Sequence, residues 1–141
     1  MRLSLCPLML LLFMACSQKA PKVLEEQKNE EPLAEIEFPG GIDYDFGTYY
    51  ERVVKNHDFL VRNPGSVPLV INQVETACGC TQATGPEKPI LKGQTDTIHV
   101  SFDGNGFVEG FWAKHIRIHA NIEGGYKELR ISGSYYDNTR N

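Results

Sequence analysis

The stretch TDTIHVSF, Thr95 to Phe102, alternates polar and apolar side chains residue by residue. Ile98, Val100 and Phe102 fall on one face, and polar side chains occupy the positions between them. Successive side chains of a β-strand point to opposite faces, so a period of two indicates a strand with one face buried in a core. An amphipathic helix would instead repeat its apolar residues every three or four positions.

The same alternation recurs on both sides of this stretch. It appears in HDFLVRN, VPLVINQVETA, FWAKHIRIHA and YKELRIS, and more briefly in AEIEF and IDYDFG. Turn signals such as Pro64-Gly65 and Glu123-Gly124-Gly125 separate the runs. Short strands at ~8–12-residue spacing are typical of a β-sandwich. We therefore predict an Ig-like antiparallel β-sandwich of about seven strands over residues 35–136, with a small closed barrel as the alternative.

The inward-facing positions of these runs define the predicted core. Its members are Phe59, Val61, Leu69, Ile71, Ile98, Val100, Ile116, Ile118, Leu129 and Ile131. The glycine-rich stretch from Asp103 to Gly110 is predicted to be a hairpin turn between two strands. Residues 137–141 are expected to form a polar tail.

The N-terminus carries a pattern typical of export. The chain opens MRLSLCPLMLLLFMACSQ, in which Arg2 precedes an apolar run that ends at Ala15. The run is shorter than the ~20 residues of a transmembrane helix, which favours a secretory signal that is removed. Its end, Phe13 to Cys16, resembles a bacterial lipobox. We expect a signal peptide over residues 1–15 and a lipid on Cys16, which anchors the protein in the bacterial cell envelope, at the outer membrane. An ordinary signal peptide with a chance cysteine is the alternative.

The composition limits which classes of partner the protein is expected to bind. Residues 16–34 are rich in Glu and Lys and lack aromatic residues, so they are predicted to be a flexible tether. The whole chain has 14 basic and 18 acidic residues and a net charge of −4. No basic stripe occurs, so nucleic acid is not an expected partner. Membrane attachment would come through the lipid.

The histidines do not form an evident metal site. His115 and His119 are four residues apart, which on a strand is ~13 Å, so the two cannot hold one ion. His57 and His99 have no visible partner in the sequence. The hydrolase elbow Gly-x-Ser-x-Gly and the zinc motif His-Glu-x-x-His are both absent. The sequence therefore predicts no enzyme of these classes, no cofactor and no metal ligand.

Cys78-Gly79-Cys80 is the candidate site. Once Cys6 leaves with the signal and Cys16 carries lipid, these two cysteines are the remaining thiols. In a regular strand their Cα atoms would be ~6.6 Å apart, and a disulfide needs Cβ atoms ~3.8 Å apart. A bridge therefore requires a bend, which Gly79 allows. Three interpretations stay open: a loop-shaping pair or local disulfide, an easily reduced redox pair, or a Cu(I) site.

A longer segment carries a family resemblance. The motifs Asp45-Phe46-Gly47-Thr48, Asn63-Pro64-Gly65, Pro68-Leu69-Val70-Ile71 and Cys78-Gly79-Cys80-Thr81 occur in this order, and ILKGQTDTIHVSFD and LRISG follow. From Tyr44 to Tyr135 the chain resembles the domain-of-unknown-function family numbered 1573, whose members are bacterial envelope proteins and often lipoproteins. Pro64 replaces a threonine common in that turn. The resemblance implies an Ig-like sandwich related to chaperone-like and cilium-associated β-domains, and no established reaction.

These observations together favour a binding or scaffolding function. We predict a lipid-anchored envelope module that is not an enzyme and that binds an envelope protein, since a sheet edge can accept another strand. One alternative is a thiol–disulfide redox protein that acts through Cys78 and Cys80. Another is a copper-handling lipoprotein.

Overall fold

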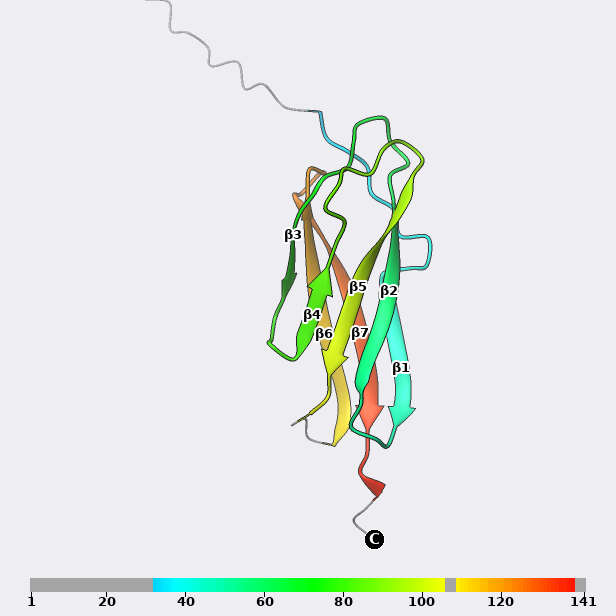
Figure 1. Cartoon of the computed structure of the whole chain (residues 1–141), viewed down its shortest axis with the longest axis vertical. Coiled ribbons are helices and arrows are strands. Elements are labelled where there is room, and N and C mark those ends of the chain that lie inside the picture. The colour runs from blue at the N-terminus through cyan, green and yellow to red at the C-terminus, as the bar shows by residue number, and fades with distance from the viewer. Residues whose placement is uncertain (1–31, 106–108, 139–141) are drawn as a thin grey trace, which may run out of the picture. The chain divides into compact units, whose positions relative to one another are not determined.

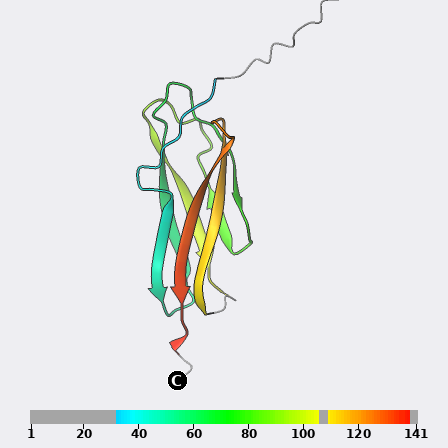
Figure 2. The same ribbon diagram turned by 180° about the vertical axis from the view of Figure 1, so that it is seen from behind.

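Seven strands in two sheets form the described part of the chain, which is residues 32–105 and 109–138 of a computed structural model (Figure 1). The strands are β1 (Asp43–Tyr49), β2 (Val54–Arg62), β3 (Ile71–Thr76), β4 (Thr81–Thr84), β5 (Thr95–Asp103), β6 (Gly110–Ala120) and β7 (Tyr126–Tyr135). One sheet has the order β1-β7-β6-β3 and the other the order β2-β5-β4. The predicted β-sandwich is confirmed, and its larger sheet faces the viewer in Figure 2.

The core lies between the two sheets, where the period-two residues meet. Ile98 and Val100 of β5 belong to the same core cluster as Ile116 and Ile118 of β6, and all four are almost completely buried. Every predicted core residue is buried except Ile71, which is half-buried. That prediction is wrong for a local reason: Ile71 begins the edge strand β3, beside a shift in the β3–β6 register between Ile71 and Gln73. A residue at a sheet edge has no neighbouring strand to cover it.

Three features of the topology differ from the sequence prediction. Strands β1 and β7 pair in parallel, Asp43 opposite Arg130 and Tyr49 opposite Tyr135, although an antiparallel sandwich was expected. The short strand β4 was not predicted as a separate element. Strands β5 and β6 lie in different sheets, so the glycine-rich stretch between them does not close a hairpin. Strand order depends on long-range contacts that alternation within one strand does not encode.

The two open sides of the sandwich are built differently. On one side, the edge strands β1 and β2 are joined by an aromatic contact, in which the Tyr44 ring of β1 stacks on His57 of β2 at 3.5 Å. Within β2, His57 also meets Phe59 edge to face at 4.5 Å. On the other side, the edge strands β3 and β4 are connected by the turn that holds Cys78 and Cys80. The aromatic contacts close the first side, and the cysteine turn crosses the second.

The segment before β1 contacts both sheets. Ala34 donates its backbone N–H to Asn121 O at 2.8 Å, and Glu37 exchanges two backbone hydrogen bonds with Arg62 of β2. In Figure 1 this segment enters at the upper end of the sandwich, and the β3–β4 turn lies in its lower half. Among residues 32–105 and 109–138, no helix is long and apolar enough to span a membrane.

Candidate functional site

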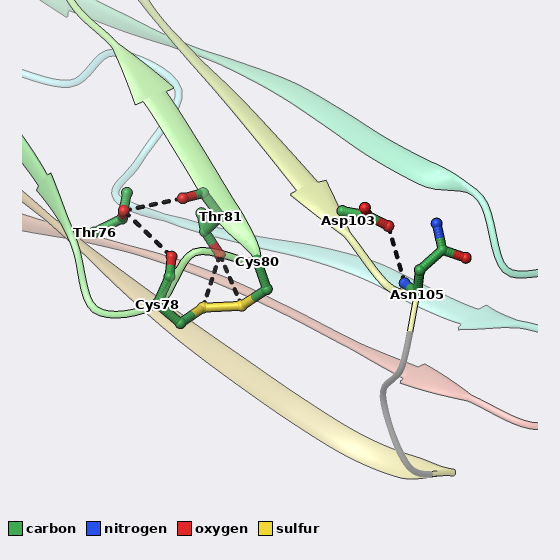
Figure 3. Close-up of a disulfide and its surroundings, with 6 residues drawn as sticks. All are labelled: Thr76, Cys78, Cys80, Thr81, Asp103 and Asn105. Carbon is green, nitrogen blue, oxygen red and sulfur yellow. Dashed lines mark hydrogen bonds between the residues drawn. A yellow bond between two sulfur atoms is a disulfide. The ribbon is translucent and has the colours of Figure 1, made fainter.

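The turn between β3 and β4 brings Cys78 and Cys80 together as a disulfide (Figure 3). Strand β3 ends at Thr76 in one sheet, and β4 begins at Thr81 in the other. The Cα atoms of the two cysteines are 5.3 Å apart, closer than the ~6.6 Å of a regular strand, so the backbone bends between them. The structure thus places the pair just past a strand end, as the sequence predicts.

Gly79 does not make this bend in the way that the sequence suggested. Its φ is not among the positive values that favour glycine, and a Cβ atom built on it meets no atom within 4 Å. An L-residue would therefore fit this position without strain in the bridged form. The bend comes instead from the change of sheet, which obliges the chain to leave β3 and enter β4 within four residues.

Two threonine side chains organise the turn. The Thr76 hydroxyl lies 2.9 Å from Thr81 O and 3.5 Å from Cys78 O, so it donates mainly to Thr81. The backbone N–H of Thr81 donates to Cys78 O at 3.2 Å. The Thr81 hydroxyl lies 3.7 Å from Cys78 Sγ and 3.8 Å from Cys80 Sγ (Figure 3). Because a disulfide sulfur carries no proton, the hydroxyl is the donor in both contacts.

The two cysteines are held to different degrees. Cys80 packs against the hydrophobic core, and its carbonyl accepts a hydrogen bond from Asp103 N of β5 at 2.8 Å. Both cysteines are half-buried, but Cys78 is not among the residues that pack on the core. Thr81, directly after Cys80, is only 3% exposed. Contacts with the core and with β5 therefore hold Cys80, whereas contacts within the turn hold Cys78.

The bridge stabilises the fold only slightly. The stabilisation by a disulfide grows with the number of residues that it encloses, and this one encloses a single residue. The chain-entropy account gives roughly 1–2 kcal/mol for so short a loop, compared with ~3 kcal/mol for a 15-residue loop. A contribution to stability is therefore a weak explanation for the pair.

A groove lies between the edges of β3 and β4, at the end of these strands away from the cysteine turn. It has a volume of about 360 Å³ and is lined by Ile71, Asn72, Gln73, Val74, Ala83, Thr84, Gly85, Pro86 and Glu87. Ile71, Val74 and Ala83 are half-buried side chains that pack on the core, and they form its apolar floor. Of the residues that line the groove, Glu87 alone is charged. Because β3 and β4 each pair on one side only, both edges offer unpaired backbone groups.

The histidines bind carboxylates or aromatic rings. His99 pairs with Asp58 at 2.8 Å, His115 with Glu128 at 2.9 Å and His119 with Glu75 at 3.0 Å. The hydrogen bond from His119 lowers the pKa of Glu75 below its ordinary value, and burial opposes this shift. His57, also without a visible partner in the sequence, stacks on Tyr44. Within the described ranges, no three His, Cys, Asp or Glu side chains gather as metal ligands.

Sequence reasoning missed part of this site. The Thr81 hydroxyl and the groove depend on strand β4, whose residues Thr81–Thr84 are few and mostly polar. The one local signal was that Thr81 follows Cys80 directly. Cys16, the predicted lipidation site, and the signal peptide lie outside the described residues.

Comparisons with known structures agree on the fold. A protein of unknown function from Porphyromonas gingivalis is 18% identical with a TM-score of 0.60, over 72% of this chain and 46% of that one. The Vibrio cholerae VesB protease is 11% identical with a TM-score of 0.55, over 72% of this chain and 32% of that one. The seventh PapD-like (ASH) domain of human CEP192 is 11% identical with a TM-score of 0.51, over 82% of this chain and 94% of that domain.

These likenesses show a β-sandwich of the PapD-like or Ig-like kind. The chain spans less than half the length of the P. gingivalis and V. cholerae proteins. Among curated proteins, none matches the chain. The family described as "Protein of unknown function (DUF1573)" matches residues 40–135, which include the cysteine turn and all seven strands, so the chain belongs to the DUF1573 family.

Proposed function

We propose that the protein is a lipid-anchored binding module of the bacterial cell envelope, which holds an extended segment of an envelope protein against β3 and β4. The open side between these two edge strands, with its groove, carries the proposal. An extended peptide adds to a sheet edge through main-chain hydrogen bonds, and adjacent pockets select alternate side chains. The groove offers both elements, because an apolar floor lies between two unpaired edges.

The opposite side of the sandwich supports this choice by contrast. There the Glu37 backbone already covers one end of the β2 edge, and a register shift between Asp45 and Thr48 interrupts β1. The Tyr44–His57 stack fills the space between these edges. Bulges, charges and covering segments are the usual means of blocking a sheet edge. The β3–β4 side lacks a covering segment among the described residues, so it is the side on which a partner strand fits.

The lining of the groove indicates the chemistry of the partner. The half-buried floor suits a segment with small apolar side chains at every second position, because alternate residues of a strand face the same way. With Glu87 as the one charge, the groove suits a segment without acidic residues.

Site-specific cross-linking in cells tests the binding proposal. A photoreactive amino acid at Ala83, in the floor of the groove, should cross-link to one segment of an envelope protein. The same residue at Leu60, which is 46% exposed on β2, is the matched control and should give no such product. Adding Ala83→Arg to a chain with the probe at Gln73 should abolish the cross-link. Equal products from positions 83 and 60, or a cross-link that survives Ala83→Arg, would contradict the proposal.

Thiol–disulfide exchange is the second candidate function. It is supported by the half-buried bridge at a turn and by its small contribution to stability. Labile disulfides have higher reduction potentials than structural ones, which typically fall below about −300 mV. A measured potential well above that value would favour exchange. If exchange is the function, changing both cysteines to serine should abolish it and leave the fold intact.

The copper-handling alternative has less support. It requires Cys78 and Cys80 as thiolates, and the structure joins their sulfurs to each other. Copper binding would therefore have to follow reduction of the bridge.

A further inference from the structure

We propose that the Cys78–Cys80 bridge accepts electrons from a protein dithiol, with Cys78 Sγ as the sulfur that is attacked and Thr81 as the residue that stabilises the departing Cys80 thiolate. This inference rests on the second candidate function, thiol–disulfide exchange, and gives it an order of events and a substrate class. It is carried by the unequal fixing of the two cysteines and by the place of one buried hydroxyl.

The order of attack follows from how each cysteine is held. Cys80 packs on the core, and its carbonyl is bonded to Asp103 N, so it cannot swing outward without breaking contacts with β5. Cys78 lies in the turn, where its carbonyl accepts hydrogen bonds from Thr81 N at 3.2 Å and from the Thr76 hydroxyl at 3.5 Å, and its side chain does not pack on the core. A mixed disulfide on Cys78 therefore leaves the inner contacts in place. A mixed disulfide on Cys80 would have to displace them.

The Thr81 hydroxyl can stabilise the sulfur that leaves. It lies 3.8 Å from Cys80 Sγ and 3.7 Å from Cys78 Sγ, so the way the two cysteines are held, and not the hydroxyl, selects the sulfur that is attacked. Thr81 is 3% exposed, so water does not compete for its proton. In the described part of the chain, the two sulfurs are its hydrogen-bond partners. A hydrogen bond to an ionised acceptor is roughly twice as strong as one to a neutral acceptor. The contact therefore strengthens as Cys80 Sγ becomes a thiolate, and a better stabilised thiolate leaves faster.

The exchange balances without a further reactant. A thiolate of the dithiol attacks Cys78 Sγ and forms a mixed disulfide, the bond between the two protein sulfurs breaks, and its electron pair goes to Cys80 Sγ. The second thiolate of the dithiol then attacks its own partner sulfur in the mixed disulfide and releases Cys78 as a thiolate. The dithiol ends as a disulfide, and Cys78 and Cys80 end as two thiols that take up the two protons of the dithiol.

The first experiment measures how fast dithiothreitol, a small dithiol, opens the bridge in the full-length protein purified in detergent. Thr81→Val, which removes the hydroxyl, should slow the opening about tenfold or more, as expected for the loss of a hydrogen bond to a charged group. Thr81→Ser keeps a hydroxyl and should restore most of the rate. Thr97→Val is the matched control: Thr97 is a half-buried threonine of β5 that lies outside the cysteine turn, so the rate of this variant should stay close to wild type. If Thr81→Val does not fold, Thr81→Ala serves in its place.

Two further measurements separate a chemical role of Thr81 from a structural one. With Cys78→Ser, thiolate absorbance against pH gives the pKa of Cys80, which should rise when Thr81→Val is added and not when Thr97→Val is added. Oxidised glutathione should form a mixed disulfide with Cys78 in the Cys80→Ser variant at least tenfold faster than with Cys80 in the Cys78→Ser variant.

The possible failures are distinguishable. A wild-type bridge that stays closed in a glutathione redox buffer would overturn the exchange function, and this inference with it. A wild-type bridge that opens, with Thr81→Val equal to wild type in rate and in the pKa of Cys80, would overturn the role of Thr81 alone. Equal or reversed reactivity of Cys78 and Cys80 would overturn the order of attack.

Discussion

The side chain of Asn63 holds together backbone segments from two separate parts of the chain. Its side chain is fully buried, and the amide nitrogen Nδ2 donates to Val67 O and Ile90 O, each at 2.8 Å. The amide oxygen accepts the backbone N–H of Gly65 at 3.0 Å, which closes the turn. The sequence identified Asn63-Pro64-Gly65 as a turn. It could not show that the same side chain also binds the strand-like stretch around Ile90, because that contact crosses 27 positions.

Asn63→Ala should therefore destabilise the fold strongly. The change removes the side-chain partner of Val67 O and of Gly65 N, and one of the two donors to Ile90 O, which also accepts Leu69 N. We expect this loss to cost about 2–4 kcal/mol. Urea unfolding followed by circular dichroism measures the loss. Asn56→Ala, at an exposed position of β2, is the control and should change stability by less than about 0.5 kcal/mol. Similar stabilities for the two variants would show that water replaces the Asn63 contacts.

At the scale of elements, β6 and β7 pack closely because Gly133 of β7 has no side chain opposite Trp112 of β6. Trp112 of β6 stacks on Phe102 at 3.9 Å between ring centroids, and its indole N–H donates to the Tyr49 hydroxyl at 2.9 Å. Burial raises the pKa of Tyr49, and the hydrogen bond with Trp112 opposes that shift. A Cβ atom on Gly133 of β7 would lie 2.9 Å from Trp112 Cζ2. Gly133 thus leaves the space in which the indole ring lies.

Gly133→Ala should destabilise the protein by about 1–3 kcal/mol, because the new methyl group forces the tryptophan ring out of its present position. Thermal unfolding gives the change, and near-ultraviolet circular dichroism reports the new environment of Trp112. Gly40→Ala is the control, since a Cβ atom there meets nothing within 4 Å and its φ is not positive. Unchanged stability and an unchanged tryptophan spectrum in Gly133→Ala would contradict this account of the packing.

The contact between β1 and β2 should respond to pH. Burial lowers the pKa of His57 below its ordinary value of 6.5, and the neighbouring Asp58 carboxylate opposes the shift. As pH falls through 6.5, the unfolded chain binds a proton at His57 before the folded chain does, so stability is lost from there down to the folded pKa. His57→Phe keeps a ring on Tyr44 and cannot titrate. Its melting temperature should fall less than that of wild type between about pH 7.5 and about pH 5.5. An equal fall in both proteins would show that other groups cause the acid response.

For the molecule as a whole, the sequence predicted what depends on local alternation. The sandwich and nearly all of the core follow from period-two runs, because one face of each strand must be buried. Three features were not predicted, because each depends on which strands pair with one another. They are the parallel pairing of β1 with β7, the assignment of β5 and β6 to different sheets, and the strand at Thr81–Thr84. For the same reason, the sequence identified the cysteines of the candidate site and missed the Thr81 hydroxyl and the groove.

The membrane anchor is a prediction for the whole molecule. Cys16→Ser should abolish lipid attachment and leave the protein unprocessed or released from the membrane. Fractionation of cells, with mass analysis of the N-terminal peptide, measures both outcomes. Cys6→Ser is the matched control and should leave processing and location unchanged. If Cys16→Ser is processed and stays in the membrane fraction as wild type does, the lipoprotein prediction is wrong.

The parallel pairing of β1 with β7 has a mechanical consequence. The chain enters this pair at Asp43 and leaves it at Tyr135, which lie at opposite ends of the paired region. A pulling force applied between the two termini would therefore slide the strands past each other lengthwise. In that geometry the hydrogen bonds between the strands bear the load together, whereas a hairpin pulled from its open end loses them one at a time. The arrangement suits a domain that stays folded under tension.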